Sequence, residues 1–317
     1  MAAALALGER GRGRTAPNPN VGCVVVRDGR VVGRGWTQPG GRPHAEAMAL
    51  AQAGEHARGA VAYVTLEPCA HESPRGPACA ELLIAAGVAH AVIALGDPDP
   101  RTDGRGIARL REAGIAVDIG TMASEAAAAL GGFLTRRRFG RPHVTLKLAT
   151  SLDGCIALAD GSSRWITGAE ARAHAHLERA RHEAILVGRA TWELDAPQLD
   201  VRLAGLEGRS PRRLMLSGHP RVRGNDEAWE VINSPQAIAD LVNVDHLLVE
   251  GGAATAAAFL DAGLVDRLLL YRAPILLGGK PALAGLGLTD IATAHGRWRL
   301  ADRRRLGSDT LEVYVTA

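Results

Sequence analysis

The sequence is poor in aromatic residues, cysteine and long apolar runs, and each shortage argues against a class of protein. Phe, Trp and Tyr make up 3% of the 317 residues, so a base-stacking surface for single-stranded nucleic acid would be thin. Four cysteines do not make a disulfide framework and favour a reducing compartment. The apolar stretches fall well short of the roughly 20 residues that a membrane-spanning helix needs. We therefore expect neither a nucleic-acid nor a membrane partner.

The charge and the N-terminus are equally unremarkable. The net charge of +3 is too small to imply a nucleic-acid partner. The first residues, MAAALALGERGRGR, are apolar and then basic, which is the reverse of a secretory signal, so we expect a cytoplasmic protein. With 47% apolar and 22% charged residues the composition is that of a globular protein, and the length favours two domains.

Strands alternate with helices along the first half, which predicts an α/β fold. Two β-branched runs around Asp28-Gly29 indicate a hairpin from residue 21 to 36. Further strands are expected at 60–68, 90–96 and 115–120, and helices at the N-terminus, 44–54, 78–87, 107–114 and 124–138.

A domain boundary is expected within RRRFGRP, residues 136–142, because Gly140 and Pro142 follow a charged helix end. The domains would be 1–140 and 143–317. The same α/β pattern restarts, with strands expected at 143–149, 184–190, 212–218, 246–252, 267–274, 297–305 and 309–316, and helices near 168–182, 234–242 and 253–262.

Four residues of the first half have the composition of a catalytic zinc site. His44 and Glu46 lie at the start of a predicted helix, and Pro68-Cys69 and Cys79 follow the next strand. One imidazole and two thiolates suit zinc and leave a fourth position for water. Glu46 is placed to take a proton from that water and pass it to a leaving amine, as in zinc deaminases. The cysteines are separated by nine residues instead of the usual two, so the loop AHESPRGPA is expected to lie beside the metal and help bind substrate.

Beyond these residues the first half resembles a known family. APNPNVGCVVV, HAEAMAL, VTLEPCAH and DPDPRTDGRG look like the deaminase half of the bifunctional riboflavin-biosynthesis deaminase/reductase. The resemblance implies a cytidine-deaminase-like α/β/α domain that removes the 2-amino group of a diaminopyrimidinone ribosylamine 5′-phosphate. It makes His44, Cys69 and Cys79 the zinc ligands and Glu46 the catalytic residue. It adds substrate contacts at Asn18, His71 and Arg75, and Arg75 suits a phosphate.

The second half contains no GxGxxG fingerprint, but Glu250-Gly251-Gly252 ends a predicted strand and is followed directly by a predicted helix from Ala253. Glycines at such a turn let backbone N–H groups approach a pyrophosphate. LKLATSLDG, SSRWITG, ILVGRATWELDAPQLDVR, LVEGG and APILLGG resemble the reductase half of the same family. That resemblance implies a dihydrofolate-reductase-like α/β domain in which NADPH reduces the ribosyl chain to ribityl.

The resemblance also implies the residues of the reductase site. The cofactor contacts would be Ala149, Trp165, Thr191, Asp195, Ser217, Gly252, Ala253, Ala254, Thr255, Ala256, Ala257 and Ala258. The substrate contacts would be Ser163, Arg179, Leu199, Arg202 and Glu250, with Arg179 and Arg202 holding a phosphate. Apart from the resemblance, Lys147 is added as a substrate contact and candidate proton donor, because it and Glu250 lie at the ends of two predicted strands, where open α/β sheets bind ligands. The chain departs from the family at Ala196, where a second acid is common, and at Cys155.

Two other functions remain open at this level. One is a nucleic-acid-editing zinc deaminase with a C-terminal binding module, which would use Arg136, Arg137 and Arg138 on phosphates. The other is a deaminase whose C-terminal half is a cofactor-less interaction domain. The sequence leaves the oligomeric state open, with a homo-oligomer as one possibility.

Overall fold

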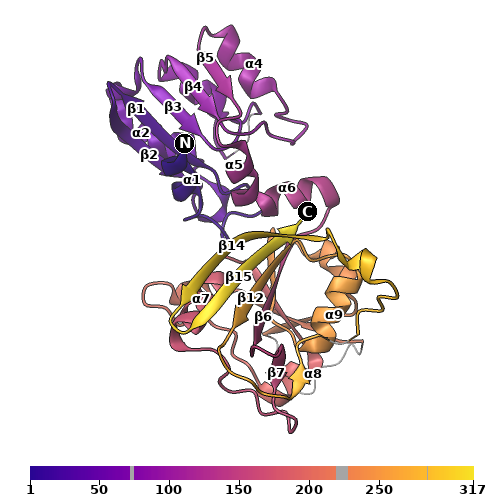
Figure 1. Ribbon diagram of the computed structural model, residues 1–317. Helices are drawn as coiled ribbons and strands as arrows, with labels where there is room; N and C mark the ends of the chain where they lie inside the picture. The colour runs from indigo at the N-terminus through magenta and orange to yellow at the C-terminus, as the bar shows by residue number, and fades with distance from the viewer. Residues whose placement is uncertain (72–74, 219–227, 284) are drawn as a thin grey trace. The chain divides into compact units, whose positions relative to one another are not determined.

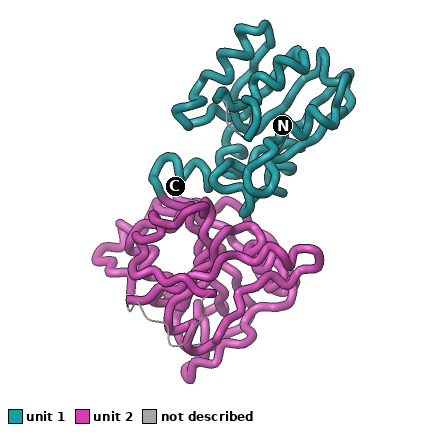
Figure 2. Tube along the Cα trace, turned by 180° about the vertical axis from the view of Figure 1, so that it is seen from behind, with its two compact units in different colours: residues 1–140 teal, residues 141–317 magenta. Residues whose placement is uncertain are grey.

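The chain forms two compact units, residues 1–140 (unit 1) and 141–317 (unit 2), shown in different colours in Figure 2. The computed structural model describes residues 1–71, 75–218, 228–283 and 285–317. Gly140 ends the last helix of unit 1 in a left-handed conformation with φ 71°, as glycine after a helix commonly does.

Unit 1 is built around a mixed sheet (Figure 1). Its strands are β1 (Gly22–Arg27), β2 (Arg30–Trp36), β3 (Val61–Val64), β4 (His90–Ile93) and β5 (Ala116–Ile119), in the order β2-β1-β3-β4-β5. β1 is antiparallel to β2 and β3, whereas β3, β4 and β5 are parallel. The hairpin turn has positive φ at both Asp28 (50°) and Gly29 (73°), which confirms the turn predicted from Asp-Gly.

Helices cover both faces of this sheet, which confirms the predicted α/β/α architecture. The helices are α1 (Ala2–Gly8), α2 (Ala45–Ala53), α3 (Cys79–Ala85), α4 (Arg105–Glu112), α5 (Ala123–Ala129) and α6 (Gly131–Phe139). A Cβ on Gly35 would lie 2.1 Å from the Ala45 carbonyl oxygen, and one on Gly22 would lie 1.8 Å from the Ala4 oxygen. Gly35 pairs with Cys23, the neighbour of Gly22, so α1 and α2 press on opposite faces.

Unit 2 contains a larger mixed sheet in the order β10-β9-β8-β11-β6-β12-β15-β14. Its strands are β6 (His143–Thr150), β8 (Ala184–Gly188), β9 (Arg212–Leu216), β10 (Trp229–Ile232), β11 (His246–Val249), β12 (Arg267–Arg272), β14 (Trp298–Leu306) and β15 (Asp309–Thr316). All are parallel except the pairings of β15 with β12 and β14. β7 (Cys155–Ala157) and β13 (Lys280–Pro281) form a separate short ladder.

The larger sheet is also covered on both faces. α9 (Ala253–Asp261) packs through Phe259 on the face that carries Leu146 and Leu148. α7 (Ala169–Arg179) packs through Ala171 on the opposite face, which carries Leu269 and Tyr271. α8 (Arg189–Asp195) follows β8 directly. The short 3₁₀ helices are η1 (Pro39–Gly41), η2 (Gly54–Ala57), η3 (Glu207–Arg209), η4 (Pro235–Asp240) and η5 (Ile291–Ala294).

The structure corrects several predicted elements. The helix expected at 124–138 is two helices, α5 and α6, which meet at Leu130 before the poor helix formers Gly131 and Gly132. The helix expected at 234–242 is the 3₁₀ helix η4. The strand expected at 184–190 stops at Gly188, and α8 begins at Arg189. In the parts of the chain that the structure describes, no helix has the length and apolar character needed to cross a bilayer.

Candidate functional site

The predicted zinc ligands converge in unit 1 from two helices and a strand end. His44 stands immediately before α2, Cys79 is the first residue of α3, and Cys69 lies in the segment that follows β3. Ligand atoms of the three residues lie within 4.8 Å of one another. The donor set, one nitrogen and two sulfurs around a common point, fits a tetrahedral zinc ion with one open position.

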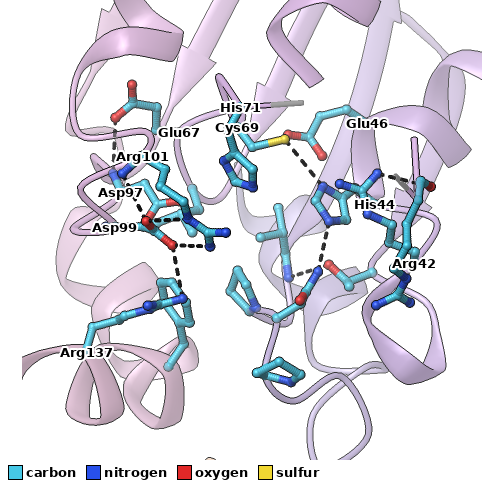
Figure 3. A pocket seen from close by; sticks show the side chains of 18 residues that line it. Arg42, His44, Glu46, Glu67, Cys69, His71, Asp97, Asp99, Arg101 and Arg137 are labelled. Atoms are coloured by element: carbon cyan, nitrogen blue, oxygen red, sulfur yellow. Dashed lines mark hydrogen bonds and ion pairs between the residues drawn. The ribbon is translucent and has the colours of Figure 1, made fainter. Parts of the chain in front are cut away.

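The ring nitrogens of His44 face different neighbours (Figure 3). Nδ1 lies 3.3 Å from Cys79 Sγ and 3.6 Å from Cys69 Sγ, so it is the nitrogen that faces the metal position. Nε2 lies 3.0 Å from the amide nitrogen of Asn18, which donates to the Gly41 carbonyl at 2.9 Å. Asn18, predicted to contact substrate, therefore lies against the side of the imidazole that faces away from the metal position.

The local electrostatics favour a thiolate at Cys69. Hydrogen bonds from the Cys79 thiol, from His44 and from the Cys79 backbone lower the pKa of Cys69, with the backbone donor 3.2 Å from its sulfur. That backbone donor belongs to the start of α3, where N–H groups point away from the helix. A thiolate is the form of cysteine that binds zinc.

Glu46 lies in the first turn of α2, where it is 3% exposed. Burial raises the pKa of its carboxyl from 4.5 to about 7, and Cys69 adds to the rise while His44 opposes it. Such a carboxyl exchanges a proton readily near neutral pH, which is what general acid–base catalysis requires. Figure 3 shows Glu46 and His44 on the same side of the pocket.

His71 and Arg75 also line this pocket, as the sequence predicted for substrate contacts. His71 Nδ1 lies 3.4 Å from Thr102 Oγ1, and burial together with Arg101 lowers the pKa of the imidazole. Arg75 Nη2 donates to the Gly40 carbonyl at 2.8 Å. Residues 72–74 of the loop expected beside the metal lie outside the described residues.

The opposite wall of the pocket carries a polar network that the sequence analysis did not assign. The buried Glu67 carboxylate accepts backbone N–H bonds from Asp97, Gly104 and Ile107, each 3.1 Å long. Asp99 accepts from Arg101 at 2.6 Å and pairs with Arg137 at 3.0 Å, and the two arginines hold the pKa of Asp99 well below its usual range. The sequence signal for this network is the segment DPDPRTDGRG, which carries part of the family resemblance.

A second cluster of charged groups lies in unit 2 beside the ends of β6 and β11. Arg179, the last residue of α7, donates to both carboxylate oxygens of Glu250 at 2.8 and 3.0 Å. Lys147 Nζ in β6 lies 3.8 Å from Glu250 Oε2. Burial opposes ionisation of Glu250, but Arg179 and Lys147 outweigh it and lower its pKa to about 2. The structure thus brings together three of the predicted substrate residues.

Arg202 lies at the rim of this cluster, with 60% of its side chain exposed. Its Nη2 is 3.5 Å from Nε2 of His176, a residue on the same helix as Arg179 that the sequence analysis missed. Tyr271 was also missed. Its hydroxyl lies 2.7 Å from His174 Nδ1, and Lys147 Nζ lies 5.9 Å from the centre of its ring.

The predicted pyrophosphate turn is the start of α9, where the N-cap is Gly252, which has no side chain to cap the helix. The N–H groups of Ala253, Ala254 and Thr255 therefore point out of the helix, as an anion site requires. Ala256 donates to the Gly252 carbonyl. The side chains of Thr255, Ala256 and Ala257 are buried and that of Ala258 is partly buried, so these residues form the inner part of the helix.

The remaining predicted residues of unit 2 lie on several elements, and Thr191 is next to this turn. Thr191 Oγ1 would be 3.6 Å from a Cβ on Gly252. Trp165 is exposed and lies under the Arg172 guanidinium, and Asp195 accepts a bond from Arg164 through its carbonyl. Ser163 is exposed, Leu199 is buried with a positive φ of 52°, and Ala149 pairs with Tyr271 across β6 and β12. Ser217, after β9, is buried beside Arg189.

Two family models match the chain. The model described as "Cytidine and deoxycytidylate deaminase zinc-binding region" matches residues 1–95, and the one described as "RibD C-terminal domain" matches residues 142–311. "Riboflavin biosynthesis protein RibD" of Escherichia coli strain K12 is 42% identical over 98% of this chain and 96% of that protein.

Solved structures agree with these matches over the full length. A RibD of Acinetobacter baumannii has a TM-score of 0.87 at 38% identity, covering 100% of this chain and 98% of that one. A protein of Thermotoga maritima has a TM-score of 0.88 at 32% identity, covering 100% of this chain and 97% of that one. Its name is diaminohydroxyphosphoribosylaminopyrimidine deaminase/5-amino-6-(5-phosphoribosylamino)uracil reductase.

Proposed function

The chain belongs to the family of the riboflavin biosynthesis protein RibD, and from that premise we propose how its residues share the chemistry. It is a bifunctional enzyme of riboflavin biosynthesis, a zinc-dependent deaminase and an NADPH-dependent reductase. We assign the deaminase to residues 1–140 and the reductase to residues 143–317. The substrate proposed for the first step is a diaminopyrimidinone ribosylamine 5′-phosphate, and that for the second is its deaminated product.

The observation that carries the deaminase assignment is the buried Glu46 carboxyl beside His44, Cys69 and Cys79. Zinc held by these three ligands supplies Lewis-acid activation of water. Glu46, buried beside these ligands, accepts a proton from the attacking water and delivers it to the amino group that leaves as ammonia.

Substrate contacts in unit 1 come from residues around the ligands. The Asn18 amide and the neutral His71 imidazole are proposed to hold the pyrimidine edge, and Arg75 the phosphate.

In unit 2 the proposed reductase residues are Lys147, Glu250, Arg179 and Arg202. NADPH supplies the hydride. Glu250 stays ionised and orients the ribose hydroxyls, while Lys147 orients the reacting nitrogen and donates a proton. Arg202 is exposed enough to meet a phosphate directly. Arg179 is proposed as its partner, although Nε, Nη1 and Nη2 of its guanidinium already donate to Glu250 and the Asp200 carbonyl.

The remaining cofactor and substrate contacts are proposed from the family pattern. They are Ser163 and Leu199 for the substrate, and Ala149, Trp165, Thr191, Asp195, Ser217 and the turn 252–258 for NADPH. We also propose a cytoplasmic location, because all four cysteines are free thiols. We propose no nucleic-acid partner. Retention of the protein on a nucleic-acid column at physiological salt would contradict this part of the proposal.

The test assays the two half-reactions separately on the full chain. We expect ammonia release from the diaminopyrimidinone substrate and, with the deaminated product, oxidation of NADPH. Arg202→Ala should raise the KM for the deaminated product and leave the NADPH affinity nearly unchanged, because Arg202 is assigned to the phosphate of the substrate. Weaker NADPH binding with an unchanged KM for the product would contradict this assignment of Arg202.

A further inference from the structure

We propose that Arg189 and Ser217 form the subsite that recognises the 2′-phosphate of NADPH, and so make the reductase select NADPH over NADH. The inference rests on the proposed reductase function of unit 2 and adds a specificity-determining residue, Arg189, to it. Arg189 is not among the cofactor contacts that the family resemblance implies.

The guanidinium of Arg189 is held in place from two sides. Its Nη1 donates to Ser217 Oγ at 3.2 Å, and its Nε donates to the Glu193 carboxylate at 2.8 Å. Nη2 has no hydrogen-bond partner in the described part of the chain, and 29% of the side chain is exposed. A fixed guanidinium with an unused edge is suited to bind a phosphate through parallel N–H bonds.

The order of strands places this pair at one end of the cofactor turn. β9, β8, β11 and β6 are neighbours in the sheet and run parallel, so their carboxyl ends lie along one edge. Ser217 follows β9, Arg189 follows β8, the turn at Gly252 follows β11, and Lys147 lies in β6. The reacting groups and Arg189 therefore lie on opposite sides of the proposed pyrophosphate turn.

Close packing also brings Arg189 next to the start of α9. A Cβ on Gly188 would lie 2.1 Å from Thr255 Oγ1, and one on Gly252 would lie 3.6 Å from Thr191 Oγ1. The first turns of α8 and α9 therefore touch. With the nicotinamide at Lys147 and Glu250 and the pyrophosphate at α9, the adenosine ribose belongs on the β8–β9 side, where Arg189 is the cation held by Ser217.

The chemistry of the pair distinguishes the two cofactors. The 2′-phosphate brings two negative charges and several acceptor oxygens, which can accept from the unused Nη2 edge of the guanidinium. NADH has an uncharged hydroxyl in the same place and forms no such ion pair. Arg164 is the alternative candidate for binding the 2′-phosphate, because it donates to the carbonyl of the proposed cofactor residue Asp195 at 3.1 Å.

The test measures binding without turnover, on the full chain. Adenosine 2′,5′-bisphosphate and 5′-AMP are titrated by calorimetry into the wild type and into Arg189→Ala. We expect the Kd for the bisphosphate to rise about 10- to 100-fold in the variant, with the Kd for 5′-AMP unchanged. Arg189→Lys should give an intermediate loss, because it keeps the charge without the planar fork.

Arg212→Ala is the matched control, because it removes the same charge from the opposite end of β9, where Arg212 pairs with Glu230. It should leave both affinities unchanged, and thermal unfolding checks that each variant is folded. An equal loss of both nucleotides in Arg189→Ala, or a selective loss of the bisphosphate in Arg164→Ala instead, would overturn the proposal. Wild-type protein that binds NADPH and NADH equally well overturns the inference alone, whereas failure to bind either contradicts the reductase function.

Discussion

Glu46 must satisfy two opposing demands in the deaminase. Its carboxyl has to lie deep enough to reach the bound water, and burial of this kind favours the protonated form. It must also release that proton within each turnover. In unit 1 burial raises the pKa of its carboxyl to about 7, so the protein around Glu46 favours a proton on this group more than water does.

The first prediction separates proton transfer from metal binding at this residue. Glu46→Gln should keep its zinc, because the ligands are His44, Cys69 and Cys79. It should lose deamination by about 10²- to 10⁴-fold, the usual worth of a positioned acid–base group, and retain reduction of the deaminated product. Atomic absorption and the two separate assays measure this. Glu81→Gln, an exposed carboxylate on α3, is the control. If zinc is lost together with activity, Glu46 is a ligand.

The second prediction concerns the charge of Glu250. The folded-state pKa of Glu250 is about 2, below its ordinary value of 4.5. Ionisation of Glu250 therefore stabilises the folded protein fully above about pH 4.5, and this stabilisation is lost as the pH falls toward 2. The difference amounts to about 3 kcal/mol. Glu250→Gln should therefore unfold more easily than the wild type at pH 7, and the gap should narrow in acid. Denaturant unfolding of both proteins across pH measures it; a gap that widens in acid contradicts the ion pairs with Arg179 and Lys147.

At the scale of elements, local patterns were enough for most strands and helices, since period, glycine and proline mark them along the chain. The Asp28-Gly29 hairpin and the helix start at His44 lie where the sequence predicted them, whereas the strand expected at 246–252 ends at Val249. The break at Leu130 and the short ladder between β7 and β13 were missed. The alanine-rich run before Leu130 favours an unbroken helix, so the break was not predicted. The ladder between β7 and β13 pairs segments that lie far apart in the chain.

In the candidate site, too, local patterns could be predicted from the sequence, whereas contacts between distant segments could not. Zinc restricts its ligands to few residue types, so His44, Cys69 and Cys79 stood out from spacing and chemistry alone. Carboxylates and arginines in loops are common, and only the fold joins Glu67 to a segment some 30 to 40 residues later. Likewise, only the fold brings His176, on α7, close to Arg202, which lies in a loop.

The third prediction tests how Glu67 holds that segment in place. Its carboxylate accepts three backbone N–H groups from residues 97–107, and one of them belongs to the first turn of α4. Glu67→Gln exchanges one acceptor oxygen for an NH₂ group, which leaves at least one buried N–H without a partner, at a cost of about 1–3 kcal/mol. Hydrogen exchange at Asp97, Gly104 and Ile107 should accelerate, and the deaminase KM should rise. Unchanged exchange at these amides would contradict the role; Glu81→Gln again serves as control.

At the scale of the whole molecule, each unit has its own hydrophobic core and its own polar site. The core of unit 1 centres on residues such as Val25, Ile93 and Leu110, and that of unit 2 on Leu146, Leu186 and Phe259. The zinc ligands lie in unit 1, whereas Lys147, Glu250 and the α9 turn all lie in unit 2. No residue assigned to one half-reaction belongs to the unit that carries the other.

The last prediction follows from this separation. Removing zinc from the full chain with a chelator should abolish ammonia release, because three ligands lose the ion that activates water. NADPH binding and reduction of the deaminated product should stay near the untreated rate, since none of the reductase residues touches the metal position. Thermal unfolding should show a lower transition for unit 1 alone, because metal binding contributes to its stability. Readdition of zinc should restore deamination. A parallel loss of reduction, restored by the same metal, would mean that the two sites depend on one another and that the division of chemistry between the units is wrong.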